Sequence, residues 1–244
     1  MQLQKKVAVI TGGGRGIGRA IALAFAEQGA SVAVAARTSE QIESVAAEIR
    51  QTGQPASAHC CDVTDRASVE QTFATVAQEF QHIDIVVCNA GGGRERTYVG
   101  QDDPDAWQAV VEQNLLGTYH VCRAALPYLR EAGGGAVINV GSGMGHQARP
   151  GNSSYHAAKA GVWMLTRCLA MEVWEDGIAV NELVPGPVAT ELTSGLLELG
   201  APHPKIPSEW TKAPQDVAPL AVFLATQGRQ GPTGQSFSLA RRPL

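Results

Sequence analysis

Short apolar runs alternate with longer amphipathic stretches along most of the chain. The apolar runs are bounded by Gly, Asn, Asp, Thr or Pro, as is typical of strands buried in a parallel sheet. They cover residues 5–10, 32–36, 55–61, 83–88, 136–140, 178–184 and 233–239. Helical periodicity marks residues 16–28, 39–50, 66–80, 104–130, 152–174 and 216–226. This alternation predicts an α/β fold, a doubly wound, mostly parallel seven-stranded sheet flanked by helices on both faces.

A segment of different composition lies at residues 188–213. It contains three prolines, two glycines and four leucines. Such a segment after the last large strand predicts a substrate flap with an apolar inner face. Leucines at helical spacing also occur in ordinary packing, which is the competing interpretation. No shift in composition elsewhere marks a boundary, so we expect residues 1–244 to form a single domain.

Composition narrows the class of protein further. A hydrophobic content of 44% and a charged content of 17% suit a chain with a large buried core. The net charge of -4 and the pI near 5.9 argue against a nucleic-acid or anionic-membrane partner. The sequence has neither a leader nor a run that could span a bilayer, so we expect a cytoplasmic protein. The five cysteines lack metal-ligand spacing, so we expect free thiols and no metal site.

The turn after the first strand is rich in glycine and opens a helix. Its spacing is Gly12-x-x-x-Gly16-x-Gly18, which differs from the G-x-G-x-x-G dinucleotide fingerprint. Backbone N–H groups and the helix dipole at such a turn attract a phosphate, and glycines allow its close approach. The turn therefore predicts a phosphate site, although it could equally serve as a tight strand–helix junction.

The end of the second strand bears on the choice of nucleotide. An NAD site usually carries an acid about 20 residues after the glycines, where it accepts a hydrogen bond from the ribose 2′-OH. Here residues 35–39 contain Arg37 and no carboxylate. Because a guanidinium pairs with a 2′-phosphate, this loop favours NADP(H), and NAD(H) is the less favoured alternative. The competing interpretation is a solvated loop arginine, with Ser39 capping the next helix.

Tyr155 and Lys159 are one turn apart on the helix predicted at residues 152–174, so they share a face. An unperturbed tyrosine has a pKa of about 10, and half-ionisation near neutral pH requires a change of ~4 kcal/mol. One positive charge at ~4 Å supplies about that much at an effective dielectric of ~20. The lysine could therefore make the tyrosine an acid and base, although the same pair is common on ordinary exposed helices.

These features together resemble the classical short-chain dehydrogenase/reductase family over essentially the whole chain. The matching motifs are Thr11-Gly12-x-x-x-Gly16-x-Gly18, Asp62, Asn89-Ala90-Gly91, Asn114, Ser142, Tyr155-x-x-x-Lys159 and Pro185-Gly186. Within the family the pattern is similar to that of 3-oxoacyl-[acyl-carrier-protein] reductases. The resemblance implies a Rossmann-type fold. It also implies hydride transfer between NADP(H) and a carbonyl or secondary alcohol, such as a 3-oxoacyl thioester or a related ketone.

The resemblance also implies roles for single residues. Tyr155 would exchange a proton with the substrate oxygen, and Ser142 would stabilise charge on that oxygen. Lys159 would lower the Tyr155 pKa and bind the nicotinamide ribose, and Asn114 would fix a water that relays protons from Lys159 to solvent. The residues that would bind the cofactor are Thr11, Gly12, Gly14, Arg15, Gly16, Ile17, Gly18, Arg37, Asp62, Val63, Asn89, Ala90, Gly91, Tyr155, Lys159, Pro185, Gly186, Val188 and Thr190.

Substrate choice is expected in the loop at residues 91–97 and in the flap. The tail at residues 239–244 departs from the usual family ending, which bears on the homo-oligomer (a tetramer or dimer) that the resemblance implies. One alternative function is an NAD-dependent sugar or alcohol dehydrogenase of the same family. Another is a cofactor-sensing protein without chemistry. That protein would be expected to lack one of Asn114, Ser142, Tyr155 and Lys159, and all four are present.

Overall fold

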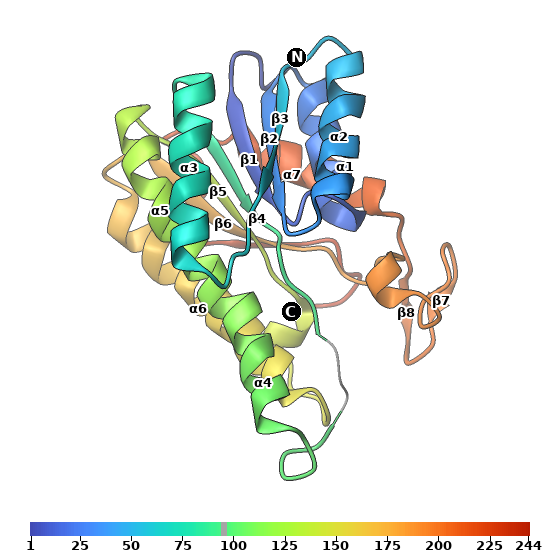
Figure 1. The fold of residues 1–244 in the computed structure, drawn as a ribbon. Helices are drawn as coiled ribbons and strands as arrows, with labels where there is room; N and C mark the ends of the chain where they lie inside the picture. Colours follow the sequence, from blue (N-terminus) through green and yellow to red (C-terminus); the bar gives the residue numbers. More distant parts are fainter. Residues whose placement is uncertain (94–96) are drawn as a thin grey trace.

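A seven-stranded parallel sheet forms the centre of the protein in a computed structural model that describes residues 1–93 and 97–244 (Figure 1). The strand order is β3-β2-β1-β4-β5-β6-β9, and every neighbouring pair is parallel. The strands are β1 (Val7–Thr11), β2 (Ser31–Ala36), β3 (Ala56–Cys60), β4 (Ile85–Cys88), β5 (Gly135–Val140), β6 (Ile178–Val184) and β9 (Ser236–Ser238). The predicted doubly wound sheet is therefore confirmed.

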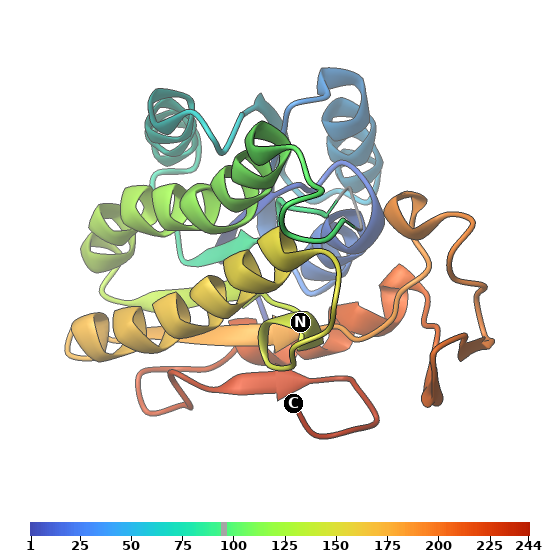
Figure 2. The same ribbon diagram turned by 90° about the horizontal axis from the view of Figure 1, so that it is seen from below.

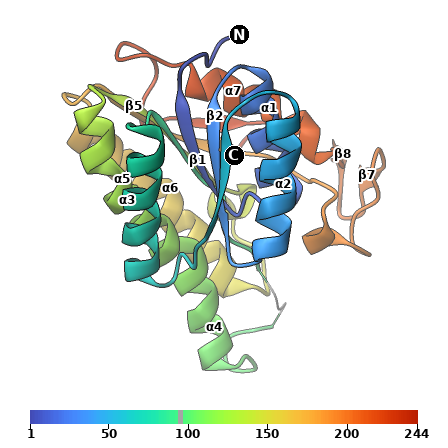
Figure 3. The same ribbon diagram turned by 45° about the horizontal axis from the view of Figure 1, so that its top comes forward.

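Helices cover both faces of the sheet (Figures 1 and 3). One face carries α1 (Gly16–Glu27), α2 (Ser39–Gln51) and α7 (Ala218–Ala225), and the other carries α3 (Arg66–Phe80), α5 (Gly117–Glu131) and α6 (Ser153–Val173). Each layer buries its own apolar core against the strands: Phe25 and Ile42 belong to the first, and Phe73 and Leu129 to the second. The apolar runs that were predicted to form buried strands are thus covered on both sides, because helices lie above and below the sheet.

The single helix predicted at residues 104–130 is wrong in detail. The structure has α4 (Pro104–Val111), then a π-helical turn at Glu112–Leu116, then α5. Within the wider turn, Asn114 Nδ2 donates hydrogen bonds to the carbonyl oxygens of Val110 and Gly92, at 2.9 and 2.8 Å. The contact with Gly92, on the loop after β4, is a tertiary contact that helical periodicity cannot reveal. Such π-helical turns are frequent at functional sites.

The predicted flap contains regular structure that the sequence did not indicate. A 3₁₀ turn at Glu191–Thr193 is followed by an antiparallel pair, β7 (Pro202–His203) and β8 (Ile206–Trp210). This pair projects from the body of the protein (Figures 1 and 2). Prolines 202, 204 and 207 are compatible with this pair, because proline is tolerated in edge strands, where few ladder hydrogen bonds are needed. Of the predicted specificity loop at residues 91–97, residues 94–96 lie outside the described residues.

The last helix and the last strand are shorter than predicted. A 3₁₀ turn at Pro214–Val217 precedes α7, and β9 pairs with β6 through three residues (Figure 2). Within residues 1–93 and 97–244, no helix is long and apolar enough to cross a membrane.

Candidate active site

Two adjoining cavities lie at the carboxyl ends of the strands. The first, about 330 Å³, is lined by the loops that follow β1 to β6, and the second, about 340 Å³, lies between the loop after β5 and the flap. Tyr155 and Gly141 line both cavities, as do Pro185, Thr190 and Leu192. Tyr155 therefore stands on the wall between the two cavities, which suits a cofactor beside a substrate.

The glycine-rich turn is shaped by close backbone contacts. Gly12 has a φ of +64°, and an added Cβ there would lie 2.8 Å from Nδ2 of Asn89. That nitrogen donates hydrogen bonds to the carbonyl oxygens of Thr11 and Gly12, at 3.1 and 3.0 Å. A Cβ on Gly18 would lie only 2.3 Å from the Gly12 oxygen, so α1 packs directly on the turn. Asn89 thereby fixes β4 to the turn after β1.

The N-terminus of α1 fits a phosphate group. Gly14, Arg15, Gly16 and Ile17 line the first cavity, and Gly16 has a φ of +54°. Arg15 occupies the N-cap position but its side chain makes no capping hydrogen bond, so it leaves the first N–H groups of α1 without a side-chain cap. These donors and the helix dipole form an anion site of the kind that holds a dinucleotide pyrophosphate.

Arg37, Asp62 and Val63 line the far end of the same cavity. Asp62 Oδ1 accepts hydrogen bonds from the backbone and the hydroxyl of Thr64, at 3.0 and 2.8 Å. Burial opposes ionisation of Asp62, but the hydrogen bonds from Thr64 and the charge of Arg37 outweigh it and lower the Asp62 pKa. The carboxylate is thus held ready to accept a hydrogen bond from an amino group, and the exposed Arg37 is available to an anion.

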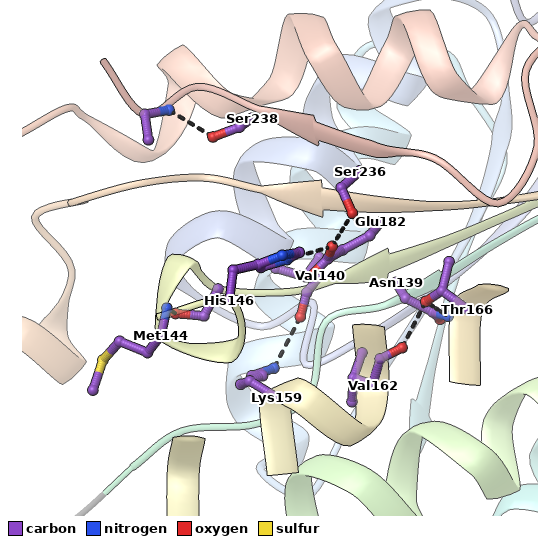
Figure 4. A network of polar contacts seen from close by, with 12 residues as sticks. Asn139, Val140, Met144, His146, Lys159, Val162, Thr166, Glu182, Ser236 and Ser238 are labelled. Carbon is purple, nitrogen blue, oxygen red and sulfur yellow. Dashed lines mark hydrogen bonds and ion pairs between the residues drawn. The ribbon is translucent and has the colours of Figure 1, made fainter. Parts of the chain in front are cut away.

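The predicted Tyr155–Lys159 pair is present, but the lysine does not act on the phenol as expected. Burial raises the pKa of Tyr155, and a hydrogen bond with Ser142 only partly offsets this. Lys159 Nζ lies 5.7 Å from the centre of the Tyr155 ring and donates a hydrogen bond to the Val140 carbonyl oxygen, at 2.9 Å (Figure 4). Burial lowers the Lys159 pKa to about 8. The expectation of a lowered Tyr155 pKa is therefore not met in this structure, because the ammonium faces the strand.

Asn114 is fully buried near this pair. Its Oδ1 accepts a hydrogen bond from the Gly92 N–H, at 3.0 Å. A Cβ on Gly91 would lie 2.5 Å from Asn114 Oδ1 and 3.6 Å from Lys159 Nζ, so these side chains approach each other across a glycine. The predicted residues Asn114, Ser142, Tyr155 and Lys159 thus come from three different segments to one place.

Most of the predicted cofactor residues line the first cavity, but four do not: Thr11, Gly18, Gly186 and Val188. Thr11 and Gly18 support the turn from behind, since Thr11 Oγ1 donates to the Val87 carbonyl oxygen and accepts from the Asn89 N–H. Gly186 and Val188 line the second cavity.

Sequence reasoning missed several residues at the site. Gln41 and Gln113 line the first cavity, and no pattern distinguishes them from ordinary helix residues, whereas Leu192 lines both cavities and belongs to the predicted flap. It also missed Glu182, which is fully buried in β6 behind the Ser142 loop. A signal for Glu182 was present, because an acid inside a strand that is apolar apart from it and Asn181 requires a partner.

Comparisons with known proteins agree with this geometry. A family model described as short chain dehydrogenase matches residues 6–198. The 3-oxoacyl-[acyl-carrier-protein] reductase of Chlamydia trachomatis is 34% identical, with 97% of this chain and 96% of that protein covered. The protein of the same name from Vibrio harveyi is 36% identical, with 97% and 96% covered. A short-chain type dehydrogenase/reductase from Mycobacterium marinum superposes with a TM-score of 0.89 at 34% identity, covering 98% and 95% of the two chains.

A doubly wound sheet, a glycine-rich turn on a helix N-terminus and a cleft at the strand ends define an α/β protein that binds a dinucleotide. The chain belongs to the short-chain dehydrogenase/reductase family. It is therefore an oxidoreductase, and its family implies a nicotinamide cofactor.

Proposed function

We propose that the protein reduces a ketone to a secondary alcohol with NADPH, and that a 3-oxoacyl thioester is the substrate class to test first. The observation that carries this proposal is the position of Tyr155 on the wall between the two cavities, hydrogen-bonded to Ser142. The substrate class is supported by relatives named 3-oxoacyl-[acyl-carrier-protein] reductase, which align over nearly their whole length.

Tyr155 is the proton donor in this proposal. Because burial raises its pKa, the phenol stays protonated at neutral pH and can donate its proton to the carbonyl oxygen as the alcohol forms. Ser142, which shares a hydrogen bond with Tyr155, holds the same oxygen and stabilises charge that develops on it. A proton lost from Tyr155 is replaced through Lys159 and a water held near Asn114, the buried amide beside it.

The first cavity would hold the cofactor. The N-terminus of α1 would bind the pyrophosphate, Asp62 the adenine amino group, and Lys159 the nicotinamide ribose. When bound, the nicotinamide supplies or accepts the hydride. The residues of this chain orient it and exclude water, with Asn89 fixing the wall between β1 and β4.

The preference for NADP(H) over NAD(H) rests on Arg37. Its guanidinium is exposed at the adenosine end of the cavity and can pair with a 2′-phosphate. Asp62, the nearby carboxylate, follows β3 and not β2, after which an NAD site carries its ribose acid, so it does not stand in for that acid.

A substrate panel tests the proposal. Purified protein is mixed with NADPH or NADH and with a 3-oxoacyl thioester, a diketone, a keto sugar or a cyclic ketone, and nucleotide oxidation is followed optically. We expect oxidation of NADPH with the thioester and much slower oxidation of NADH. Faster turnover of a keto sugar with NADH would contradict the proposal and favour the alternative, an NAD-dependent sugar dehydrogenase.

A further inference from the structure

A carboxylate shielded from solvent lies behind the Ser142 loop, which we define as residues 141–146. Glu182 is 0% exposed in β6. Its Oε2 lies 2.9 Å from Nε2 of His146 and accepts a hydrogen bond from Ser236 Oγ on β9 (Figure 4). Since an ionised carboxylate has only acceptors, Nε2 of His146 is the donor in this pair. One buried acid therefore joins the loop to both of the last strands of the sheet.

The other carboxylate oxygen faces the first residue of the loop. Among the described residues Glu182 Oε1 has no hydrogen-bond partner. A Cβ on Gly141 would lie 1.9 Å from this oxygen, so the loop backbone presses directly on the carboxylate. Because a buried, incompletely paired charge destabilises a fold, Glu182 is a poor choice for packing alone.

The Ser142 loop is held from its opposite side by α6. A Cβ on Gly145 would lie 2.7 Å from the backbone carbon and oxygen of Lys159. The His146 ring packs on Trp163 of α6, with their centroids 4.9 Å apart. The loop that carries Ser142 is thus confined between Glu182 on β6 and the backbone at Lys159 on α6.

Glu182 also acts on Lys159 through its charge. Burial lowers the Lys159 pKa, and Glu182, followed by Cys88 of β4, opposes this effect. The groups that face the carboxylate are His146 from the loop and Ser236 from β9. Glu182 is the largest source of negative charge that acts on the buried ammonium.

We propose that Glu182 is a positioning residue of the reduction: through His146 it fixes the Ser142 loop, and its carboxylate acts on the ammonium of Lys159, which donates a hydrogen bond to the Val140 carbonyl oxygen directly before that loop. Neither Glu182 nor His146 lines either of the two cavities, so Glu182 acts through its neighbours. The inference rests on the proposed function, but the effect of the Glu182 charge on the titration of Lys159 can be measured without turnover.

The first experiment titrates Lys159 by NMR. The chain has five lysines, so protein labelled with ¹³C at lysine Cε gives a simple spectrum, in which Lys159→Met identifies the Lys159 signal. In the wild type Lys159 should titrate near pH 8, and in Glu182→Gln it should titrate at a lower pH. Ser236→Ala removes the hydrogen bond to Glu182 but keeps the charge of Glu182, so Lys159 should titrate as it does in the wild type. In Glu182→Asp, which retains the charge, Lys159 should titrate at a higher pH than in Glu182→Gln. This variant is compared with wild type instead if Glu182→Gln fails to fold.

The second experiment measures kcat for reduction against pH. In Glu182→Gln the loss of activity at high pH should begin at lower pH, whereas a merely structural defect would lower kcat equally at every pH. His146→Leu should lower kcat by about tenfold or more with NADPH affinity kept, because Ser142 loses its fixed position. His146→Gln retains a donor and should recover part of that loss.

An unchanged Lys159 titration in Glu182→Gln would overturn the electrostatic half of the inference. Wild-type kcat in His146→Leu would overturn the positioning half. A wild-type protein that reduces no carbonyl would overturn the proposed function instead, and the Lys159 titration would still decide the charge effect.

Discussion

Lys159 Nζ donates a hydrogen bond to the carbonyl oxygen of Val140, 2.9 Å away, at the last residue of β5. The lysine that follows Tyr155 by one helical turn is thereby fixed to the strand that leads into the Ser142 loop. Lys159 is 5% exposed as a residue, and its Nζ lies 5.7 Å from the centre of the Tyr155 ring. Helix α6 and strand β5 are joined directly beside the site.

This buried ammonium should cost the protein stability. Its pKa falls from 10.5 to about 8, so the folded state binds the proton less tightly, which corresponds to about 3 kcal/mol. The penalty is full below pH 8 and disappears as the pH rises toward 10.5. We expect Lys159→Met to be at least as stable as wild type at neutral pH in urea unfolding and to lose most activity. A large loss of stability would contradict this account of the ammonium.

The rate of reduction should fall as the pH rises through about 8, because Lys159 then loses its proton. Tyr155 should not produce this change, since burial raises its pKa above the ordinary value of 10.0. The check is kcat between about pH 6 and pH 10, at saturating NADPH. A profile that stays flat to the alkaline end would show that Lys159 does not control the step.

Arg37→Asp should reverse the nucleotide preference. The substitution removes the partner of a 2′-phosphate and introduces a carboxylate that repels it and accepts from a 2′-OH. We expect the ratio of kcat/KM for NADPH to that for NADH to fall by about 100-fold, equivalent to ~3 kcal/mol. Arg66→Asp makes the same charge change at the start of α3, outside both cavities, and should leave the ratio unchanged. A wild type that already prefers NADH would refute this role of Arg37.

The C-terminal tail ties the flap to the body. Arg242 Nε lies 3.1 Å from Glu209 Oε1 on β8, and the Arg242 guanidinium also donates to Gln147 after the Ser142 loop. Glu209 is 1% exposed, so Arg242→Ala should leave a buried carboxylate without its ion-pair partner and lower the free energy of unfolding by about 3 kcal/mol.

Arg241→Ala is the matched control for this change. Only the backbone N–H of Arg241 donates to Glu209, at 3.2 Å, so the side chain can be removed without loss of the contact. Thermal unfolding and limited proteolysis of the flap should separate the two variants. Equal thermal stability and equal proteolysis of the flap in Arg241→Ala and Arg242→Ala would show that the Arg242–Glu209 pair does not hold the flap.

The parts of the fold that depend on local pattern could be predicted from the sequence. Runs such as Ile178–Val184 are mostly apolar because both sheet faces are covered, and this strand has the predicted bounds. Arg66–Phe80 is a predicted helix with unchanged ends, capped by Asp65, whose side chain accepts from the Ala67 N–H. The glycine-rich turn after β1 and the i, i+4 spacing of Tyr155 and Lys159 are equally local.

The parts that depend on distant contacts could not be predicted. The π-helical turn at Glu112–Leu116 accompanies the bonds of Asn114 to Gly92, a residue outside its helix. The pairing of Glu182 with His146 joins residues 36 positions apart. The direction of the Tyr155 pKa shift depends on where the Lys159 ammonium points, and helical spacing alone does not fix that rotamer.

Tyr155→Phe tests the central claim most directly, since it removes one hydroxyl from the wall between the two cavities. The measurement is kcat for ketone reduction together with the affinity for NADPH, measured by nucleotide fluorescence. We expect kcat to fall by about 10³-fold with affinity nearly unchanged, because the proton donor is lost while the cofactor walls remain. A variant that keeps about a tenth or more of wild-type kcat would contradict the assignment of Tyr155 as the acid.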